Sequence, residues 1–208
     1  MNLDFEKRLW NKGYEYVFGL DEVGRGPLAG PVVTCCVFVK PNIDISDDFL
    51  NKVKDSKKIS HKKRELILEE LKTIPGIEYA ICKIEPEEID KINILKATLK
   101  SFKNSTLLLE KKINHKPNIL LIDGNKTIPD FEYMQESIIQ GDSKVFSIAL
   151  ASIIAKEYRD KIMIKCADKY PNYLFENNKG YGTKDHICSI KKFGICEIHR
   201  KTFIKNFK

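Results

Sequence analysis

The sequence predicts an α/β fold in which a mixed β-sheet is flanked by helices. Two apolar, strand-sized segments, residues 16–20 and 31–39, lie close together and are joined by a glycine-rich turn. Further along, strand-sized segments alternate with segments of helical spacing, an order typical of sheets covered by helices. Apolar residues make up 42% of the 208 residues, which is enough to form the core of one domain.

The first half of the chain contains short elements with clear boundaries. Ser60 is placed to cap a helix, and Gly76 ends the segment that follows. After Gly76 the apolar residues alternate, which predicts a third strand. In this half we expect a helix at 3–12, strands at 16–20, 31–39 and 77–84, a polar loop at 40–58 and a helix at 60–71.

The second half is richer in helical spacing. Pro86 suits the first turn of a helix, and the acidic Glu87 and Glu88 that follow it favour the same position. Residues 118–122 (NILLI) are continuously apolar, which predicts a central strand covered on both faces. The expected elements are one helix from 86 through 102, strands at 118–122 and 137–140, and helices at 144–169 and 183–193.

Composition argues against membrane and secreted classes of protein. The longest apolar run, around residues 32–39, is strand-sized, and the N-terminus has no apolar stretch of the signal-peptide type. The six cysteines form no CxxC pair and do not combine with the four histidines at zinc-ligand spacing. We therefore expect free, buried thiols in a cytoplasmic protein.

The net charge of +7 is concentrated near the C-terminus. Residues 179–208 carry eight basic side chains against Asp185 and Glu197. Such a run is either a solvated basic surface or a surface that contacts a polyanion such as nucleic acid. Charge alone does not separate these two interpretations.

Four acidic residues follow the predicted strands or precede a helix. Asp21 and Glu22 come directly after one strand, Asp123 follows another, and Asp142 precedes the long helix. Each of them alone has a simpler interpretation, as a cap of a turn or helix. Together they predict a cluster of carboxylates that needs a cation, and ligands that are all oxygen suit Mg²⁺ or Mn²⁺. Two such ions are the known arrangement for phosphoryl chemistry.

Two glycine-containing segments add to this candidate site. GRGPLAG, residues 24–30, is neither a P-loop nor a dinucleotide fingerprint, but it directly follows the first two acids. Its glycines allow close approach of backbone groups to a ligand, and Arg25 adds a charged fork. In GYGT, Tyr181 stands between two glycines, either as an ordinary turn tyrosine or as an exposed ring for a sugar or base.

Seven ordered segments resemble the bacterial ribonuclease HII family, the type 2 ribonucleases H. They cover nearly the whole chain. These segments are GLDEVGRGPLAGPVV (19–33), DSKKIS (55–60), IDKINILKATL (89–99), LLIDGN (120–125), GDSKVFSIALASIIAKEYRD (141–160), NKGYGTKDH (178–186) and IHRKTF (198–203).

The resemblance implies a ribonuclease H-like sheet and a metal-dependent endoribonuclease. Its substrates would be the RNA strand of RNA/DNA hybrids and single ribonucleotides in duplex DNA, cut on their 5′ side to leave 3′-hydroxyl and 5′-phosphate ends, as in ribonucleotide excision repair. Asp21, Glu22, Asp123 and Asp142 would hold two Mg²⁺ or Mn²⁺ ions.

Further residue roles are implied by the same resemblance. Gly24, Arg25 and Gly26 would meet the 2′-hydroxyl, and Tyr181 the neighbouring sugar; only a 2′-hydroxyl separates RNA from DNA at one nucleotide. Lys57 and Lys144 match family positions and would contact phosphates. We leave Asp160 out of the metal set, because a contact between helices or with an arginine suits it better. The four carboxylates form the candidate catalytic set. The candidate substrate-binding set is Gly24, Arg25, Gly26, Tyr181, Lys57 and Lys144.

The same resemblance bears on organisation and partners. We expect a catalytic domain at 1–170 with a helical substrate-binding extension at 171–208, acting as a monomer. Only 20 residues precede Asp21, which disfavours the type 3 enzymes with their extra N-terminal domain. The terminal NFK has no obvious clamp-binding extension, so contact with a replication clamp stays open.

Two other classes of function compete with this interpretation. One is a nucleic-acid-binding module without catalysis, against which the presence of all four acids argues. The other is a small-molecule phosphotransferase, which lacks a nucleotide-binding lysine motif.

Overall fold

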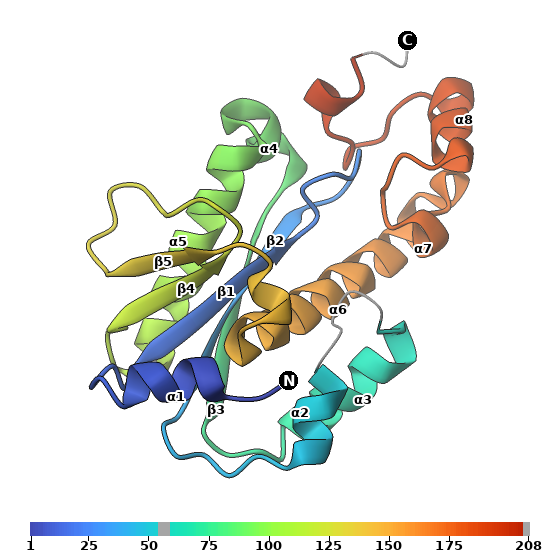
Figure 1. Ribbon diagram of the computed structural model, residues 1–208. Helices are drawn as coiled ribbons and strands as arrows, with labels where there is room; N and C mark the ends of the chain where they lie inside the picture. Colours follow the sequence, from blue (N-terminus) through green and yellow to red (C-terminus); the bar gives the residue numbers. More distant parts are fainter. Residues whose placement is uncertain (54–58, 206–208) are drawn as a thin grey trace.

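A five-stranded mixed sheet lies at the centre of the computed structural model, which describes residues 1–53 and 59–205 (Figure 1). The strands are β1 (Val17–Val23), β2 (Val32–Val39), β3 (Ile77–Ile84), β4 (Ile119–Asp123) and β5 (Gln135–Ile138). Their order is β3-β2-β1-β4-β5. β2 pairs antiparallel with both β1 and β3, whereas β4 pairs parallel with both β1 and β5. The predicted mixed sheet is confirmed.

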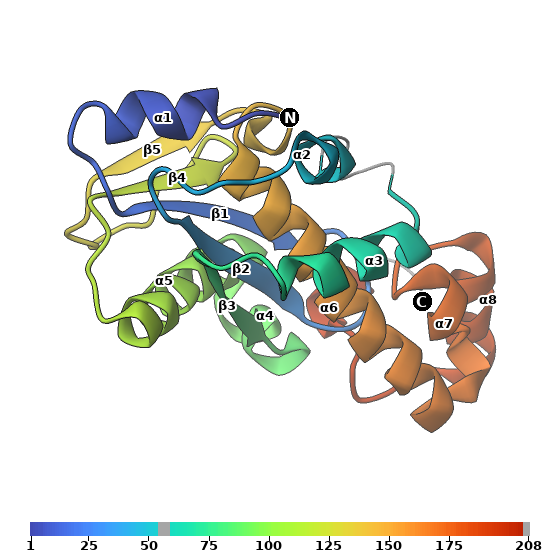
Figure 2. The same cartoon turned by 90° about the horizontal axis from the view of Figure 1, so that it is seen from below.

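Helices cover both faces of this sheet. The helices of the described ranges are α1 (Asp4–Trp10), α2 (Asp47–Val53), α3 (His61–Leu71), α4 (Pro86–Ile92), α5 (Ile94–Ile113), α6 (Phe146–Lys169), α7 (Phe175–Asn178) and α8 (Lys184–Phe193), of which α7 and α8 lie beyond the sheet. Seen from below in Figure 2, α4 and α5 lie on one side of the sheet and α2, α3 and α6 on the other.

The central strands send alternate residues into these two layers. Phe18 and Leu120 pack in the cluster that contains the apolar face of α5. Val17 and Leu121 belong to a cluster on the opposite face, which includes the start of α6. This period of two buries both faces of β1 and β4, which confirms the prediction made for residues 118–122.

Gly19 allows α6 to lie close to β1. A Cβ at this position would be 2.5 Å from Ser147 Oγ, so any side chain would push the helix away. Ser147 is itself held by the buried Glu6, whose carboxylate accepts hydrogen bonds from the Ser147 amide and hydroxyl at 2.8 and 2.9 Å. Further along the same helix, Ser152 hydrogen-bonds to Asp21. The close packing thus brings α6 to the candidate site.

Two predicted elements were wrong in part. Residues 40–58 were expected to form a loop, but 47–53 form α2, which buries Phe49, Leu50 and Val53. The single helix expected from 86 through 102 is two helices, separated at Asn93. Asn93 adopts φ +68° and its side chain accepts the amide of Lys96, so it stops one helix and caps the next.

Smaller differences concern the ends of strands and the cysteines. β1 extends to Val23, so Asp21 and Glu22 are part of the strand and do not follow it. All six cysteines are free, as predicted. Cys35 and Cys36 are buried in opposite layers, whereas Cys188 is exposed. The expectation that all thiols are buried is therefore wrong.

The C-terminal segments lie at the end of α6 that is remote from α1 (Figure 1). They form a separate apolar cluster, in which Tyr173, Phe175 and Ile190 pack against Leu28 of the glycine-rich loop and Met163 of α6. The division into domains at residue 170 stays a prediction. Within the described ranges, 1–53 and 59–205, no helix combines the length and apolar character needed to cross a membrane.

Candidate active site

Three of the four predicted acids line one cavity. β1 and β4 are parallel with Leu20 beside Ile122, so the next residues along, Asp21 and Asp123, are neighbours at the same end of the sheet. They open onto a cavity of about 290 Å³. Its lining residues are Asp21, Glu22, Val23, Arg64, Asp123, Ser152, Lys156 and Tyr181.

The fourth acid, Asp142, lies beside this cavity and is not among its lining residues. It is buried in a short 3₁₀ turn, Gly141–Ser143, that precedes α6. The amide of Gly141 in this turn donates a 2.7 Å hydrogen bond to Asp123 Oδ1. The turn therefore orients Asp123 and carries Asp142 next to it.

Burial and like charge raise the carboxyl pKa values at this site. The pKa of Asp21 lies well above its usual range because the group is buried and because Glu22 and Asp123 carry like charges. Burial also raises the pKa of Glu22, although Arg25 opposes the shift through an ion pair at 3.2 Å. Oxygen donors that repel one another in this way fit a hard divalent cation such as Mg²⁺ or Mn²⁺.

The glycine-rich loop approaches Tyr181. Gly24 has φ +93°, and a Cβ there would lie 2.3 Å from Arg159 Nε, so only glycine fits. A Cβ on Gly26 would lie 3.9 Å from the Tyr181 ring, so the loop and the ring face each other. Tyr181 is 41% exposed and is available to a ligand.

Two buried arginines, which sequence reasoning did not select, hold these loops together. Arg200 donates to the carbonyl oxygens of Gly24, Arg25 and Gly30. Arg159 donates to the carbonyl oxygens of Ala29, Pro31 and Lys179. Arg159 thus joins the glycine-rich loop to the segment before Tyr181. Arginine side chains are usually exposed, so composition and spacing do not predict that these two are buried. The only sequence signal for them is that they lie in segments that resemble the family.

Arg200 also corrects the interpretation of the basic C-terminal run. It was counted among the basic residues of a possible polyanion surface, but it is fully buried. Lys191 and Lys192 are exposed on α8. The exposed basic surface is therefore smaller than the sequence suggested, and its contact with nucleic acid stays a prediction.

Asp160 contacts an arginine, as expected. It accepts hydrogen bonds from Arg64 Nη2 and from Lys156 Nζ, both at 2.7 Å. Arg64 also donates to Ile59 O and to Glu157, so each of its three guanidinium nitrogens makes a hydrogen bond. Arg64 and Lys156 line the cavity, so this network on α3 and α6 forms part of its wall.

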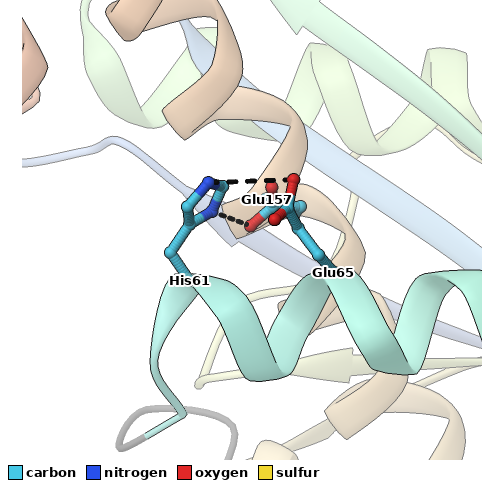
Figure 3. Close-up of side chains that lie close together, drawn as sticks. All are labelled: His61, Glu65 and Glu157. Carbon is cyan, nitrogen blue, oxygen red and sulfur yellow. Dashed lines mark hydrogen bonds and ion pairs between the residues drawn. The ribbon is translucent and has the colours of Figure 1, made fainter.

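A second group of potential metal ligands lies on the same two helices (Figure 3). His61 Nδ1 is 2.9 Å from the buried Glu157 Oε2, and Glu65 lies one turn further along α3. Arg64 and Lys161 already form ion pairs with Glu157, at 3.1 and 3.4 Å. Since cations neutralise these carboxylates, we interpret the group as an ion-pair network between α3 and α6.

The two lysines expected at phosphates have different outcomes. Lys57 lies outside the described residues. Lys144 is exposed, and its Nζ donates to the carbonyl of Ile139 at 2.7 Å, away from the cavity lining. Their contact with phosphate stays a prediction.

The fold is that of the ribonucleases H. A ribonuclease H2 from Pyrococcus horikoshii aligns with TM-score 0.70 and 26% identity, covering 92% of this chain and 100% of its own. The ribonuclease HII of a PCNA complex from Archaeoglobus fulgidus gives TM-score 0.71 at 24% identity, covering 92% and 96%. A Bst ribonuclease HIII in complex with Mn²⁺ gives 0.66 at 18%, covering 87% and 63%. The fold and the acidic cavity define a ribonuclease H-type endonuclease.

Sequence comparison gives the family. The ribonuclease HII family matches residues 18–206. The ribonuclease HII of Endomicrobium trichonymphae is 46% identical over 96% of this chain and 90% of its own length. That of Caldicellulosiruptor bescii is 44% identical over 98% and 93%. The chain belongs to the ribonuclease HII family, which confirms the resemblance.

Proposed function

We propose that the protein cleaves the RNA strand of RNA/DNA hybrids and the 5′ side of single ribonucleotides in duplex DNA. The products would carry 3′-hydroxyl and 5′-phosphate ends. The observation that carries the proposal is the shared cavity, in which Asp21, Glu22 and Asp123 lie with the ring of Tyr181. Carboxylates for phosphoryl chemistry and a group able to contact a sugar therefore face the same space.

The carboxylates would hold two Mg²⁺ or Mn²⁺ ions. Asp21, at the centre of the acidic group, is the best candidate for a ligand shared by both, with Glu22, Asp123 and Asp142 completing the set. When bound, such ions activate water and stabilise negative charge on the phosphate and the leaving oxygen. The Mn²⁺ complex of the ribonuclease HIII with the same fold supports this assignment.

Recognition of the ribonucleotide would come from the two loops. Gly24, Arg25 and Gly26 would present backbone groups to the 2′-hydroxyl, while the exposed ring of Tyr181 packs on the next sugar. Both loops are fixed by the guanidinium groups of Arg159 and Arg200, so little reorganisation is needed on binding. Contact between the glycine-rich loop and the 2′-hydroxyl would be the basis on which the enzyme selects a ribonucleotide over a deoxyribonucleotide.

The proposed partner, C-terminal extension, oligomeric state and location all rest on this proposed activity. Duplex nucleic acid would be the partner, with the segment 171–208 as a substrate-binding extension. A role in removing ribonucleotides from DNA would place a monomeric enzyme in the cytoplasm.

Three matched duplexes test the function: all-DNA, DNA with one ribonucleotide, and a continuous RNA strand paired with DNA. We expect cleavage of the second and third in Mg²⁺ or Mn²⁺, none in EDTA, and none of the all-DNA duplex. End-labelled products and phosphatase treatment identify the ends. Binding to the duplexes without cleavage in either metal would instead indicate a binding module.

A further inference from the structure

Two buried histidines connect the C-terminal segment to the backbone of Tyr181. His186, in the first turns of α8, is fully buried, and His199 is 2% exposed. His186 Nδ1 lies 2.9 Å from the carbonyl oxygen of Tyr181, and His186 Nε2 lies 3.0 Å from His199 Nε2. At the other end, the amide of Cys196 donates to His199 Nδ1 at 2.9 Å.

The groups at both ends of this chain of hydrogen bonds require that donation runs from Cys196 through His199 and His186 to Tyr181. The Cys196 amide can only donate, so His199 Nδ1 accepts and His199 carries its proton on Nε2. The carbonyl of Tyr181 can only accept, so His186 carries its proton on Nδ1. His199 Nε2–H then donates to the bare His186 Nε2. All donors find acceptors when both rings are neutral.

The opposite arrangement of protons leaves mismatches. His199 Nδ1 also lies 3.3 Å from the Cys196 carbonyl oxygen, to which it would donate if protonated. The Cys196 amide would then face an N–H group, and a neutral His186 would turn a bare nitrogen toward the Tyr181 carbonyl. A charged His186 would restore the bond to Tyr181, but burial lowers the pKa of both imidazoles, that of His199 to about 4, so charged forms are disfavoured near neutral pH.

The histidines are also locked by their surroundings. The His186 ring packs edge-on against Phe175 at 5.3 Å, and the His199 ring against Tyr173 at 4.9 Å between centroids. The backbone at His199 forms an isolated antiparallel bridge with Ala29 of the glycine-rich loop. The histidine pair therefore has fixed contacts on both sides, one at the peptide of Tyr181 and one at the glycine-rich loop.

We propose that His186 and His199 are positioning residues for Tyr181, fixing the peptide that aims its exposed ring at the sugar beside the scissile phosphate. This role rests on the proposed function. The ring is 41% exposed, and Arg159 lies over it at 5.9 Å from Cζ to the ring centre, so the ring has a contact on one face and stays accessible to a ligand. The peptide that carries the ring is fixed separately, because the carbonyl of Tyr181 accepts hydrogen bonds from His186 Nδ1 and from the amide of Thr183 at 2.8 Å.

The arrangement of protons is tested first, on the whole protein without substrate. Nitrogen NMR of ¹⁵N-histidine-labelled protein at neutral pH should find the proton of His186 on Nδ1 and that of His199 on Nε2. The reverse tautomers, or exchange between them, would overturn the directed chain of hydrogen bonds. This measurement does not depend on catalytic activity.

Variants of His186 separate positioning from packing. His186→Asn keeps an amide nitrogen at the place of Nδ1, His186→Gln keeps one at the place of Nε2, and His186→Phe keeps the aromatic ring alone. The readout is the ratio of kcat/KM at a single ribonucleotide to that on a continuous hybrid. We expect the ratio to fall about three- to tenfold in the Phe and Gln variants and to stay near that of the unaltered protein in the Asn variant.

A double variant completes the test. If His186 acts through Tyr181, adding His186→Phe to Tyr181→Ala should lower the ratio no further. A further fall of the ratio in the Tyr181→Ala background would assign His186 to packing alone. The same conclusion would follow if the ratios of the His186 variants ranked in the same order as their melting temperatures. If the unaltered protein cleaves neither substrate, the proposed function is overturned and this role falls with it. If it cleaves both and His186→Phe leaves the ratio unchanged, only this role is overturned.

Discussion

Arg200 Nη2 lies 2.6 Å from the carbonyl oxygen of Gly24, across 176 positions of the chain. The same guanidinium also binds the carbonyl of Gly30, so it bridges both ends of the glycine-rich loop. The amides of Leu28 and Ala29 donate to the carbonyl of Gly180, and that of Gly30 to the carbonyl of Ile198, so the loop is held through its donors as well as its acceptors. Burial and the nearby charge of Arg159 lower the pKa of Arg200 to about 9, which still leaves it charged at neutral pH.

Arg200→Lys should misplace the glycine-rich loop while keeping the charge. A lysine cannot bind the carbonyls of Gly24, Arg25 and Gly30 together, because it lacks the planar fork. We expect a loss of about 2–4 kcal/mol in the free energy of unfolding and a lower rate at single ribonucleotides. Denaturant unfolding and cleavage assays measure both. The exposed Lys201→Ala is the matched control, and equal effects of the two variants would contradict the bridging role.

The role of Arg200 marks the limit of what the sequence predicts. The carboxylates were found because strand ends and helix starts carry local signals, and Asp21 and Asp123 do meet through parallel pairing. The arginines have no such signal, since their partners are backbone carbonyls far along the chain. The break at Asn93 was missed for a related reason, because apolar spacing continues through it and only its φ of +68° separates the helices.

Asp21→Asn should abolish cleavage and leave duplex binding intact or tighter. The change removes the central carboxylate and reduces the negative charge that faces the phosphates. Because burial and like charge raise the pKa of Asp21, the metal-free protein should also melt at a higher temperature. Cleavage assays, binding assays and thermal melting in EDTA test these outcomes, with the exposed Asp185→Asn as control. Near-normal rates in Mg²⁺ would remove Asp21 from the metal set.

Tyr181→Ala should reduce cleavage at a single ribonucleotide more than cleavage within a continuous hybrid. Removal of a stacking interaction costs about 1–3 kcal/mol by analogy with stacking on bases, or roughly one to two decades in rate. Neighbouring riboses in the hybrid leave other interactions available. Metal affinity should hardly change, because no carboxylate is altered. Equal reductions on both substrates would mean that Tyr181 does not read the junction.

Neutralising Lys191 and Lys192 should weaken binding to all duplexes similarly. Both are exposed on α8, at the end of the molecule remote from α1 (Figure 1). The slope of log affinity against log salt should flatten by about one unit for each lysine–phosphate interaction that is removed. Lys7→Ala with Lys12→Ala, at α1, is the control pair. An unchanged slope for the α8 pair would identify these lysines as solvated surface.

The buried histidine pair should make stability depend on pH below 6.5. The pKa of His199 falls from 6.5 to about 4 on folding, because the ring is desolvated and lies beside His186. Between these values the unfolded chain binds a proton that the folded chain does not. The stabilisation is therefore complete above pH 6.5 and is lost as the pH falls toward 4, by roughly 3 kcal/mol at most.

The variant His199→Gln isolates this contribution. Carboxylates add their own acid dependence, but the difference in slope between this variant and the unaltered protein belongs to the histidine pair. We expect the free energy of unfolding, measured with denaturant from pH 7 to pH 4, to fall less steeply in His199→Gln. The exposed His115→Gln should keep the slope of the unaltered protein. If His199→Gln also keeps it, the buried ring does not resist protonation, and an NMR titration of His199 would then find its pKa near 6.5.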